Sequence, residues 1–122
     1  MTAQAGVEPD KVALVLGDAV RTYGDLHTRA GRLAGALSAL GAGPGRAVAV
    51  MLPNGFELFE VGAATVRGGT RLLPLNWHLK ADEVAWILAD SGAAVLVADE
   101  ALAAVADAAA ARAAGCQVLL VG

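Results

Sequence analysis

Few side chains in this sequence are of the types that perform chemistry, and they are widely separated. The only histidines are His27 and His78, and the only cysteine is Cys116. No group of histidine, cysteine and carboxylate residues has the spacing of metal ligands, so a zinc site is not expected. Asp82 and Glu83 fall at the start of a predicted helix, where carboxylates interact favourably with the helix dipole, and this favours a structural role over acid–base catalysis. No catalytic constellation can be assembled from these residues.

Glycine recurs at Gly41, Gly43 and Gly45 and resembles half of a dinucleotide-binding fingerprint. That fingerprint has to follow a strand and open a helix, so that the amino terminus of the helix faces the pyrophosphate. Here the glycines follow a predicted helix and lead into a predicted strand. We therefore expect a tight helix-to-strand turn at this point and no phosphate site.

Length and composition narrow the class of protein further. The chain has 122 residues, of which 57% are hydrophobic and 17% charged, and its formal net charge is −3. This length suits one domain, and the acidic balance without a basic cluster argues against nucleic-acid binding. Apolar runs are too short for a transmembrane segment, and the first residues do not resemble a signal peptide. A single cysteine fits a reducing compartment, so we expect a cytoplasmic protein.

Hydrophobic periodicity predicts a hairpin followed by alternating helices and strands. The hairpin strands are 12–16 and 20–23, and Thr22 with Asp25 has the spacing of a capping box that starts the first helix. Asn54 is the expected N-cap of the second helix. The remaining elements are expected in this order: helix 26–40, strand 46–52, helix 55–67, strand 71–75, helix 81–90, strand 94–98, helix 101–114 and strand 117–121.

This alternation is typical of βαβ units. We expect an α/β fold, namely a mostly parallel sheet with helices on both faces, preceded by an N-terminal β-hairpin. Trp77, Trp86 and Cys116 are interpreted as packing residues. The chain stops one residue after strand 117–121, which is of a type that is normally covered by a following crossover. We therefore expect the sequence to be the beginning of a larger protein.

Four sequence segments carry a further signal: RTYGDL at 21–26, GAGPGRAVAVMLPN at 41–54, LPLNWHL at 73–79 and DEVAWILADSGA at 82–93. In this order and spacing they resemble the N-terminal region of AMP-forming acyl-CoA synthetases, of the adenylate-forming, AMP-binding enzyme superfamily. The resemblance extends from about residue 9 to the end of the chain. The sequence LNWH is similar to bacterial fatty acyl-CoA ligases, whereas peptide-synthetase adenylation domains usually carry Asp-Pro at this point and fit less well.

The resemblance implies the function of a fatty acid–CoA ligase. Such an enzyme uses ATP and Mg²⁺ to activate a medium- or long-chain fatty carboxylic acid as acyl-adenylate, and then transfers the acyl group to coenzyme A. The family's phosphate loop, adenine-binding aromatic motif, ribose-binding Asp and C-terminal lid with its catalytic lysine have no counterpart here. Residues 1–122 are therefore expected to form an N-terminal subdomain that ends before the phosphate loop, with no catalytic residue, no bound cofactor and no activity alone.

One binding residue follows from the resemblance. Related CoA ligases often have Arg at the second position after the Asn of the LNWH segment, where it approaches the CoA phosphates, and this chain has His78 there. Histidine is shorter than arginine and is only partly charged near neutral pH. His78 is therefore either a contact of the CoA phosphates or a loop histidine that packs beside Trp77.

The alternative function is a non-catalytic remnant or an assembly module that needs a separately encoded remainder. An apolar strand at 117–121 that stays at the edge of the sheet would expose unpaired backbone groups, and the helix face with Phe56 and Phe59 would stay partly exposed. We therefore expect the chain to self-associate. Leu119→Lys or Leu120→Lys is expected to increase solubility.

Overall fold

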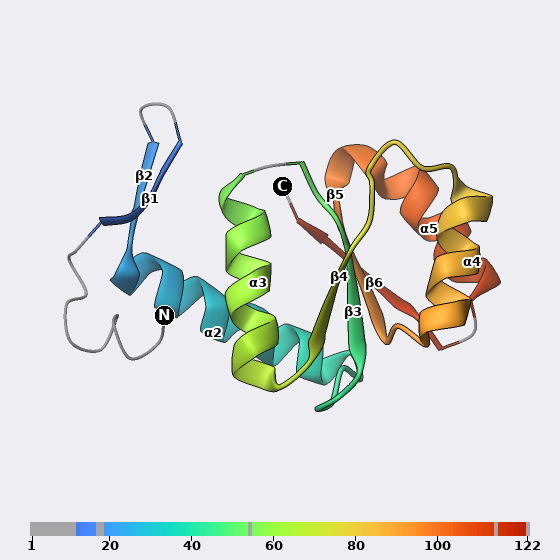
Figure 1. Ribbon diagram of the computed structural model, residues 1–122, viewed down its shortest axis with the longest axis horizontal. Helices are drawn as coiled ribbons and strands as arrows, with labels where there is room; N and C mark the ends of the chain where they lie inside the picture. The colour runs from blue at the N-terminus through green and yellow to red at the C-terminus, as the bar shows by residue number, and fades with distance from the viewer. Residues whose placement is uncertain (1–11, 17–18, 54, 114, 122) are drawn as a thin grey trace.

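The computed structural model describes residues 12–16, 19–53, 55–113 and 115–121. A parallel sheet with the strand order β4-β3-β5-β6 lies at the centre of the molecule (Figure 1). Its strands are β3 (Ala47–Met51), β4 (Arg71–Pro74), β5 (Val95–Asp99) and β6 (Gln117–Val121). The helices are α2 (Tyr23–Ala39), α3 (Phe56–Gly68), α4 (Ala81–Ser91), a short 3₁₀ turn η1 (Glu100–Leu102) and α5 (Ala103–Arg112). This confirms the predicted α/β class with its parallel sheet.

The predicted hairpin is present as the antiparallel strands β1 (Val12–Leu16) and β2 (Ala19–Thr22), which stand apart from the central sheet (Figure 1). The turn residues 17 and 18 lie outside the described residues. A capping box joins β2 to α2, as predicted. The hydroxyl of Thr22 accepts a hydrogen bond from the Asp25 N–H at 3.1 Å, and the Asp25 carboxylate accepts one from the Thr22 N–H at 3.2 Å. These bonds satisfy N–H groups that a helix start leaves without an intrahelical partner.

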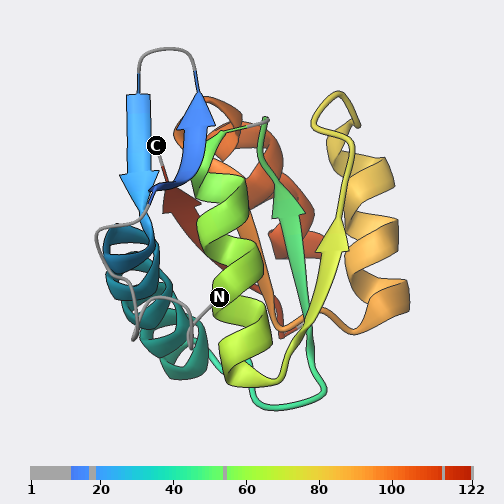
Figure 2. The ribbon, with the colours of Figure 1, turned by 60° about the vertical axis from the view of Figure 1, so that its left-hand side comes forward.

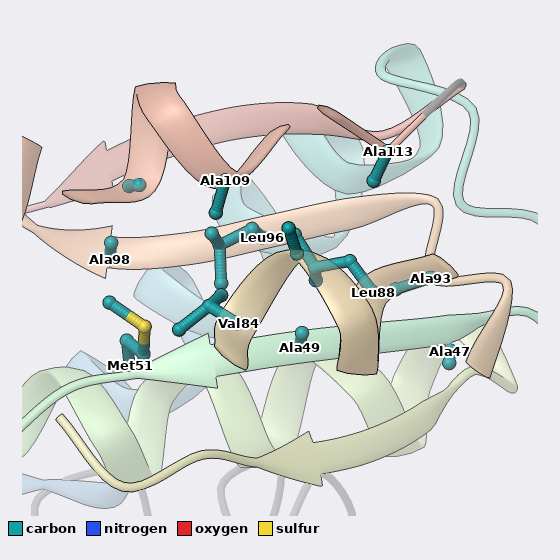
Figure 3. Close-up of a cluster of buried hydrophobic side chains, with 12 residues drawn as sticks. Ala47, Ala49, Met51, Val84, Leu88, Ala93, Leu96, Ala98, Ala109 and Ala113 are labelled. Atoms are coloured by element: carbon teal, nitrogen blue, oxygen red, sulfur yellow. The ribbon is translucent and has the colours of Figure 1, made fainter. Parts of the chain in front are cut away.

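The helices cover both faces of the sheet, as the sequence predicts (Figure 2). Helices α2 and α3 pack on one face, where Leu37 and Val61 join the core residues of β3 and β5. Helices α4 and α5 pack on the other face, where Val84 and Leu88 contact the same strands together with small residues of α5 (Figure 3). Strand β3 is buried at all five of its positions, because it has a strand on each side and helices on each face.

Several helix ends differ from the sequence prediction. Helix α3 begins after Gly55, which provides no side-chain hydrogen bond, and the predicted N-cap Asn54 lies outside the described residues. Helix α5 ends at Arg112 instead of continuing to 114, because the backbone of Ala113 is already extended, with φ −111° and ψ 101°. Gly69 closes α3, with a φ of +69° that side chains rarely adopt.

Two predictions about aromatic residues are wrong. Trp77 and Trp86 were expected to be packing anchors, but 45% and 69% of their surfaces are exposed. Trp77 lies in the loop after β4, and Trp86 lies on the side of α4 opposite to Val84 and Leu88, which takes it away from the sheet. The helix face with Phe56 and Phe59 is divided, because Phe56 is buried and only Phe59 is exposed. No helix among the described residues is long and apolar enough to cross a membrane.

Candidate functional site

The carboxyl ends of the parallel strands form the edge of the sheet at which α/β proteins usually bind ligands. The chain runs from β3 through α3 to β4 on one side, and then returns through α4 to β5 on the other side of β3. The winding therefore reverses between β3 and β5. Met51 pairs with Ala98 at this point, so the segments that follow the two strands begin side by side. This reversal point is the position that the fold offers for a ligand.

Asp99 is the titratable residue at the end of β5. Its carboxylate oxygen Oδ1 accepts a hydrogen bond from the backbone N–H of Ala101 at 2.8 Å, and Asp99 in this way caps the turn η1. The segment that follows β3 contains the buried Leu52 and the exposed Pro53. The Asp99 carboxylate at the reversal point therefore already serves a backbone group.

The loop between β4 and α4 carries His78, the binding residue that the resemblance implies. The side-chain oxygen of Asn76 accepts a hydrogen bond from the His78 N–H at 2.9 Å, and the Asn76 carbonyl accepts one from the Leu79 N–H at 3.1 Å. These bonds form a tight turn that projects His78 into solvent. The imidazole stacks against Trp77, with ring centroids 3.7 Å apart and planes tilted by 32°. His78 thus packs beside Trp77, as one of the two alternatives describes, and the same side chain stays accessible to a ligand.

A cavity of about 230 Å³ lies between α2, α3 and the end of β6. Two arginines, two glutamates and three apolar residues line this cavity. They are Arg29, Arg32, Leu33, Glu57, Glu60, Val61 and Val121. Glu60 is buried, and its Oε1 atom lies 3.6 Å from Nε of Arg29, whose side chain is half exposed. The cavity presents opposite charges, so its residues can hold a polar group.

Sequence reasoning missed this charged cavity, although one signal was available. Glu60 lies four residues after Phe56 and four residues before Ala64, and both of these residues are buried. Positions four apart lie on the same face of a helix. A carboxylate within this inward face could have been recognised as a group that needs a cationic partner. The identity of that partner, Arg29 on α2, depends on how the two helices pack.

The two histidines lie on different parts of the fold. The carbonyl of His27 on α2 accepts a hydrogen bond from Nη1 of Arg67 at 3.2 Å, and Nη2 of Arg67 lies 3.2 Å from Nε2 of the His27 ring. His27 therefore connects α2 to the end of α3, whereas His78 lies beyond β4. Within the part of the chain that the structure describes, no group of three histidine, cysteine or carboxylate side chains could hold a metal ion.

Cys116 precedes β6 and packs against the core cluster beneath α4 and α5. Burial raises the pKa of its thiol above the ordinary value, and the positive charge of Arg46 offsets part of this effect. A raised pKa lowers the fraction of thiolate, which is the nucleophilic form. This environment agrees with the packing role that we predicted for Cys116.

The glycine-rich segment forms a turn, as expected. Gly41 and Gly45 have positive φ angles of 99° and 81°, and the segment links the end of α2 to the start of β3. The N–H of Gly45 donates to the carbonyl of Gly69 at 2.9 Å, so the turn is held against the end of α3. Its amide groups serve the fold at the amino ends of the strands, away from the edge at which α/β sheets bind ligands.

Comparisons with known proteins agree with this arrangement. The family model described as AMP-binding enzyme matches residues 1–122. Among solved structures, the fatty acyl CoA synthetase of Mycobacterium tuberculosis superimposes with a TM-score of 0.84 and is 32% identical. The match covers 98% of this chain and 25% of that protein.

Curated relatives of two kinds match at similar identity. The fatty acid–[acyl-carrier-protein] ligase ScoC of Streptomyces coeruleorubidus is 37% identical over 76% of this chain, which is 18% of ScoC. The phosphinothricin tripeptide synthetase PhsB of Streptomyces viridochromogenes is 40% identical over 80% of this chain, which is 8% of PhsB. The chain therefore spans less than a fifth of the length of either relative, and identity alone does not separate acid ligases from peptide synthetases.

Proposed function

Because the chain belongs to the AMP-binding enzyme family, we propose that it supplies the amino-terminal scaffold of an ATP-dependent acid–CoA ligase. The observation that carries this proposal is the agreement with the Mycobacterium tuberculosis fatty acyl CoA synthetase over 98% of the chain. Residues 1–122 would form one subdomain, in which the sheet and its helices position the loops after β3 and β4. We favour an acid–CoA ligase over a peptide synthetase, because the LNWH segment after β4 resembles fatty acyl-CoA ligases.

The complete enzyme would join a fatty acid of medium or long chain length to coenzyme A. The carboxylate of the fatty acid would attack the α-phosphorus of ATP, so that an acyl-adenylate forms and pyrophosphate leaves. The sulfur of coenzyme A would then attack the acyl carbonyl group and release AMP. Magnesium would neutralise the phosphate charge during the first step. These substrates, and the single thiol of Cys116, fit a protein of the cytoplasm.

The chain alone is expected to be inactive. At the reversal point of the sheet, the Asp99 carboxylate caps the turn η1. The charged cavity between α2 and α3 presents Arg29 and Arg32 together with two glutamates, so it offers a triphosphate no net positive charge. Catalysis of adenylate formation needs several donors that converge on the phosphates.

His78 is proposed to contact the phosphates of coenzyme A. Its ring is exposed at the ligand-binding edge of the sheet, and the Asn76 turn holds its backbone in place. When the ring is protonated it carries a positive charge, which would attract a phosphate group. Stacking on Trp77 restricts the ring to few orientations, which lowers the entropic cost of binding.

A chimera tests the ligase proposal. This chain would replace the equivalent segment of the Mycobacterium tuberculosis fatty acyl CoA synthetase, and both pyrophosphate exchange and acyl-CoA formation would be measured. We expect the chimera to retain both activities, while the isolated chain has neither. A chimera that folds but lacks pyrophosphate exchange would contradict the scaffold function, and turnover by the isolated chain would contradict its inactivity.

The same chimera tests His78. His78→Ala is expected to raise the KM for coenzyme A several-fold and to leave pyrophosphate exchange unchanged, because that step precedes coenzyme A. His78→Arg should lower this KM, since arginine carries a permanent charge. His27→Ala is the matched control, because His27 lies on α2, contacts Arg67 of α3 and has no role in this proposal. Equal effects of the two alanine substitutions would rule out the proposed contact.

A second candidate function is that of a non-catalytic assembly module that acts through self-association. The observation in its favour is the edge strand β6, which exposes apolar side chains, with 39% of the Leu120 surface accessible. Light scattering of the purified chain over a concentration series tests it. A chain that remains monomeric at high micromolar concentration would exclude this function.

A further inference from the structure

The loop between β4 and α4 is anchored by two leucines and displays two aromatic rings between them. Leu75 and Leu79 pack against the core cluster beneath α4 and α5. Trp77 and His78 are exposed, with 45% of the Trp77 surface accessible. The Leu75 N–H donates to the Val50 carbonyl at 2.8 Å, which ties the start of the loop to β3. The exposed aromatic pair is therefore held on a fixed stretch of backbone.

The two exposed tryptophans of the chain differ in their surroundings. Trp77 has the imidazole of His78 against its ring, at a centroid distance of 3.7 Å. Trp86 shares a hollow with Asp82 and Glu83, whose carboxylates would repel a phosphate group. Trp77 is thus the tryptophan that combines an accessible aromatic surface with a neighbour that can carry a positive charge.

A tryptophan beside an imidazole suits a ligand that carries a base and a phosphate close together. Every nucleobase has a π-face that stacks on an aromatic side chain, and such stacking does not require hydrogen bonds to the base. A protonated imidazole attracts a phosphate group. His78 is proposed above to contact the phosphates of coenzyme A. Trp77 is the next residue, so the base within its reach is the adenine of the same molecule.

We propose that Trp77 stacks against the adenine of coenzyme A and makes the site selective for an acceptor that carries a nucleotide. This inference rests on the proposed acid–CoA ligase function and extends it from a phosphate contact to the choice of acceptor. The distinction is relevant because ScoC is a fatty acid–[acyl-carrier-protein] ligase. A carrier protein presents its thiol on a phosphopantetheine arm, which has no adenine and would gain nothing from Trp77.

Steady-state kinetics of the chimera described above test the stacking. Trp77→Ala should raise the KM for coenzyme A about tenfold, which corresponds to roughly 1.4 kcal/mol. The KM for 4′-phosphopantetheine should change by less than about twofold, because this acceptor lacks the base. Trp77→Phe should keep most of the affinity, since a phenyl ring still stacks. Trp86→Ala is the matched control and should leave the KM of both acceptors unchanged.

Three kinetic results would overturn the proposal. An unchanged KM for coenzyme A in Trp77→Ala would show that the base does not use this ring. An equal rise for coenzyme A and 4′-phosphopantetheine would mean that the substitution acts on the loop as a whole. A rise in the KM for ATP alone would assign the ring to the adenine of ATP instead.

A double substitution separates stacking from a mere orientation of His78. If Trp77 contacts the base itself, Trp77→Ala should also raise the KM for coenzyme A in the His78→Ala background. If the effect disappears in that background, Trp77 acts only through the imidazole and the stacking is wrong. If His78→Ala alone has no effect but Trp77→Ala remains selective for coenzyme A, the phosphate contact is wrong and the stacking stands.

A binding measurement on the chain itself does not depend on ligase activity. Because the chain has two tryptophans, Trp86→Phe leaves Trp77 as the only one. Adenosine 3′,5′-bisphosphate, the nucleotide half of coenzyme A, should quench the fluorescence of this variant, whereas ribose 5-phosphate, which lacks a base, should not. Circular dichroism establishes that the variant is folded.

The two experiments distinguish failure of the inference from failure of the proposed function. An active chimera together with an unquenched, folded Trp86→Phe chain would overturn the stacking and leave the ligase function standing. Base-dependent quenching together with a folded chimera that forms no acyl-CoA would overturn the ligase function and leave a nucleotide site at Trp77.

Discussion

The Nε atom of Arg29 lies 3.6 Å from the Oε1 atom of Glu60, and this ion pair joins α2 to α3 on one face of the sheet. The two partners differ in environment, since the Arg29 side chain is 50% exposed and that of Glu60 only 6%. A carboxylate at such a buried position has lost most of its hydration and depends on neighbouring groups for compensation. The arginine is one of these groups.

Arg29→Ala is expected to destabilise the chain by about 1–3 kcal/mol, because it removes a cation from a buried carboxylate. The exposure of Arg29 keeps the effect below that of a fully buried pair. Urea denaturation would measure the loss. Arg32→Ala is the matched control, since this exposed arginine lines the same cavity and should change stability by less than about 0.5 kcal/mol. Equal losses in the two variants would contradict a specific contribution of the ion pair.

Leu88→Ala is expected to destabilise the chain by about 2–5 kcal/mol, because it leaves a cavity in the core beneath α4 (Figure 3). Leu88 is 1% exposed and packs against β3 and β5. Val66→Ala provides the comparison, because Val66 is 82% exposed and its removal leaves no cavity. Thermal or urea unfolding of both variants measures the difference. A loss below 1 kcal/mol for Leu88→Ala would indicate a core that repacks around the missing atoms.

Thr22→Ala should cost about 0.5–2 kcal/mol, because α2 loses the side-chain acceptor for the Asp25 N–H. Thr28→Ala within the same helix removes a hydroxyl from an exposed interior position and should be neutral or slightly stabilising, since alanine favours helix more than threonine. Urea unfolding followed by circular dichroism compares the two. Similar stabilities would mean that water replaces the Thr22 cap at no cost.

Alkylation of Cys116 by iodoacetamide should have its midpoint at a higher pH than that of the urea-unfolded chain, because burial raises the pKa of the folded thiol. Arg46→Gln should move this midpoint higher still, whereas Arg112→Gln should not move it. The same shift affects stability. The raised pKa has no effect on stability below the thiol pKa of the unfolded chain, which is roughly 8.5. Above that pH it lowers the stability of the folded chain until the pH reaches the thiol pKa of the folded chain, because only the unfolded thiol ionises in this interval. A folded midpoint at or below the unfolded one would contradict the burial effect.

Local patterns allowed much of the fold to be predicted. The strand 117–121 and the capping box of Thr22 and Asp25 were correct, because each depends on residues that are close in the sequence. The predicted strand 46–52 is also present, as β3, and it is buried at all five of its positions. Helix ends were less accurate, since α5 ends before the predicted residue 114.

The candidate site was predictable only in part. The position of His78 after a strand followed from the sequence, and its packing beside Trp77 was one of two alternatives that the sequence left open. The exposure of Trp86 could not be predicted from the sequence, because an aromatic residue on an amphipathic helix can face either the core or solvent. Leu119 and Leu120 were treated alike for lysine substitution, but only Leu120 is exposed, since Leu119 packs against the α2–α3 side of the sheet.

The sequence by itself determined the order of helices and strands, the parallel sheet and the family, because periodicity, caps and motifs are local properties of the chain. Tertiary structure alone decided which charged side chains meet. The contact of Arg29 with Glu60 requires the packing of α2 on α3, and so does the contact of the His27 ring with Arg67. Both relationships join residues whose proximity arises from the packing of separate elements, so no local pattern in the chain encodes them.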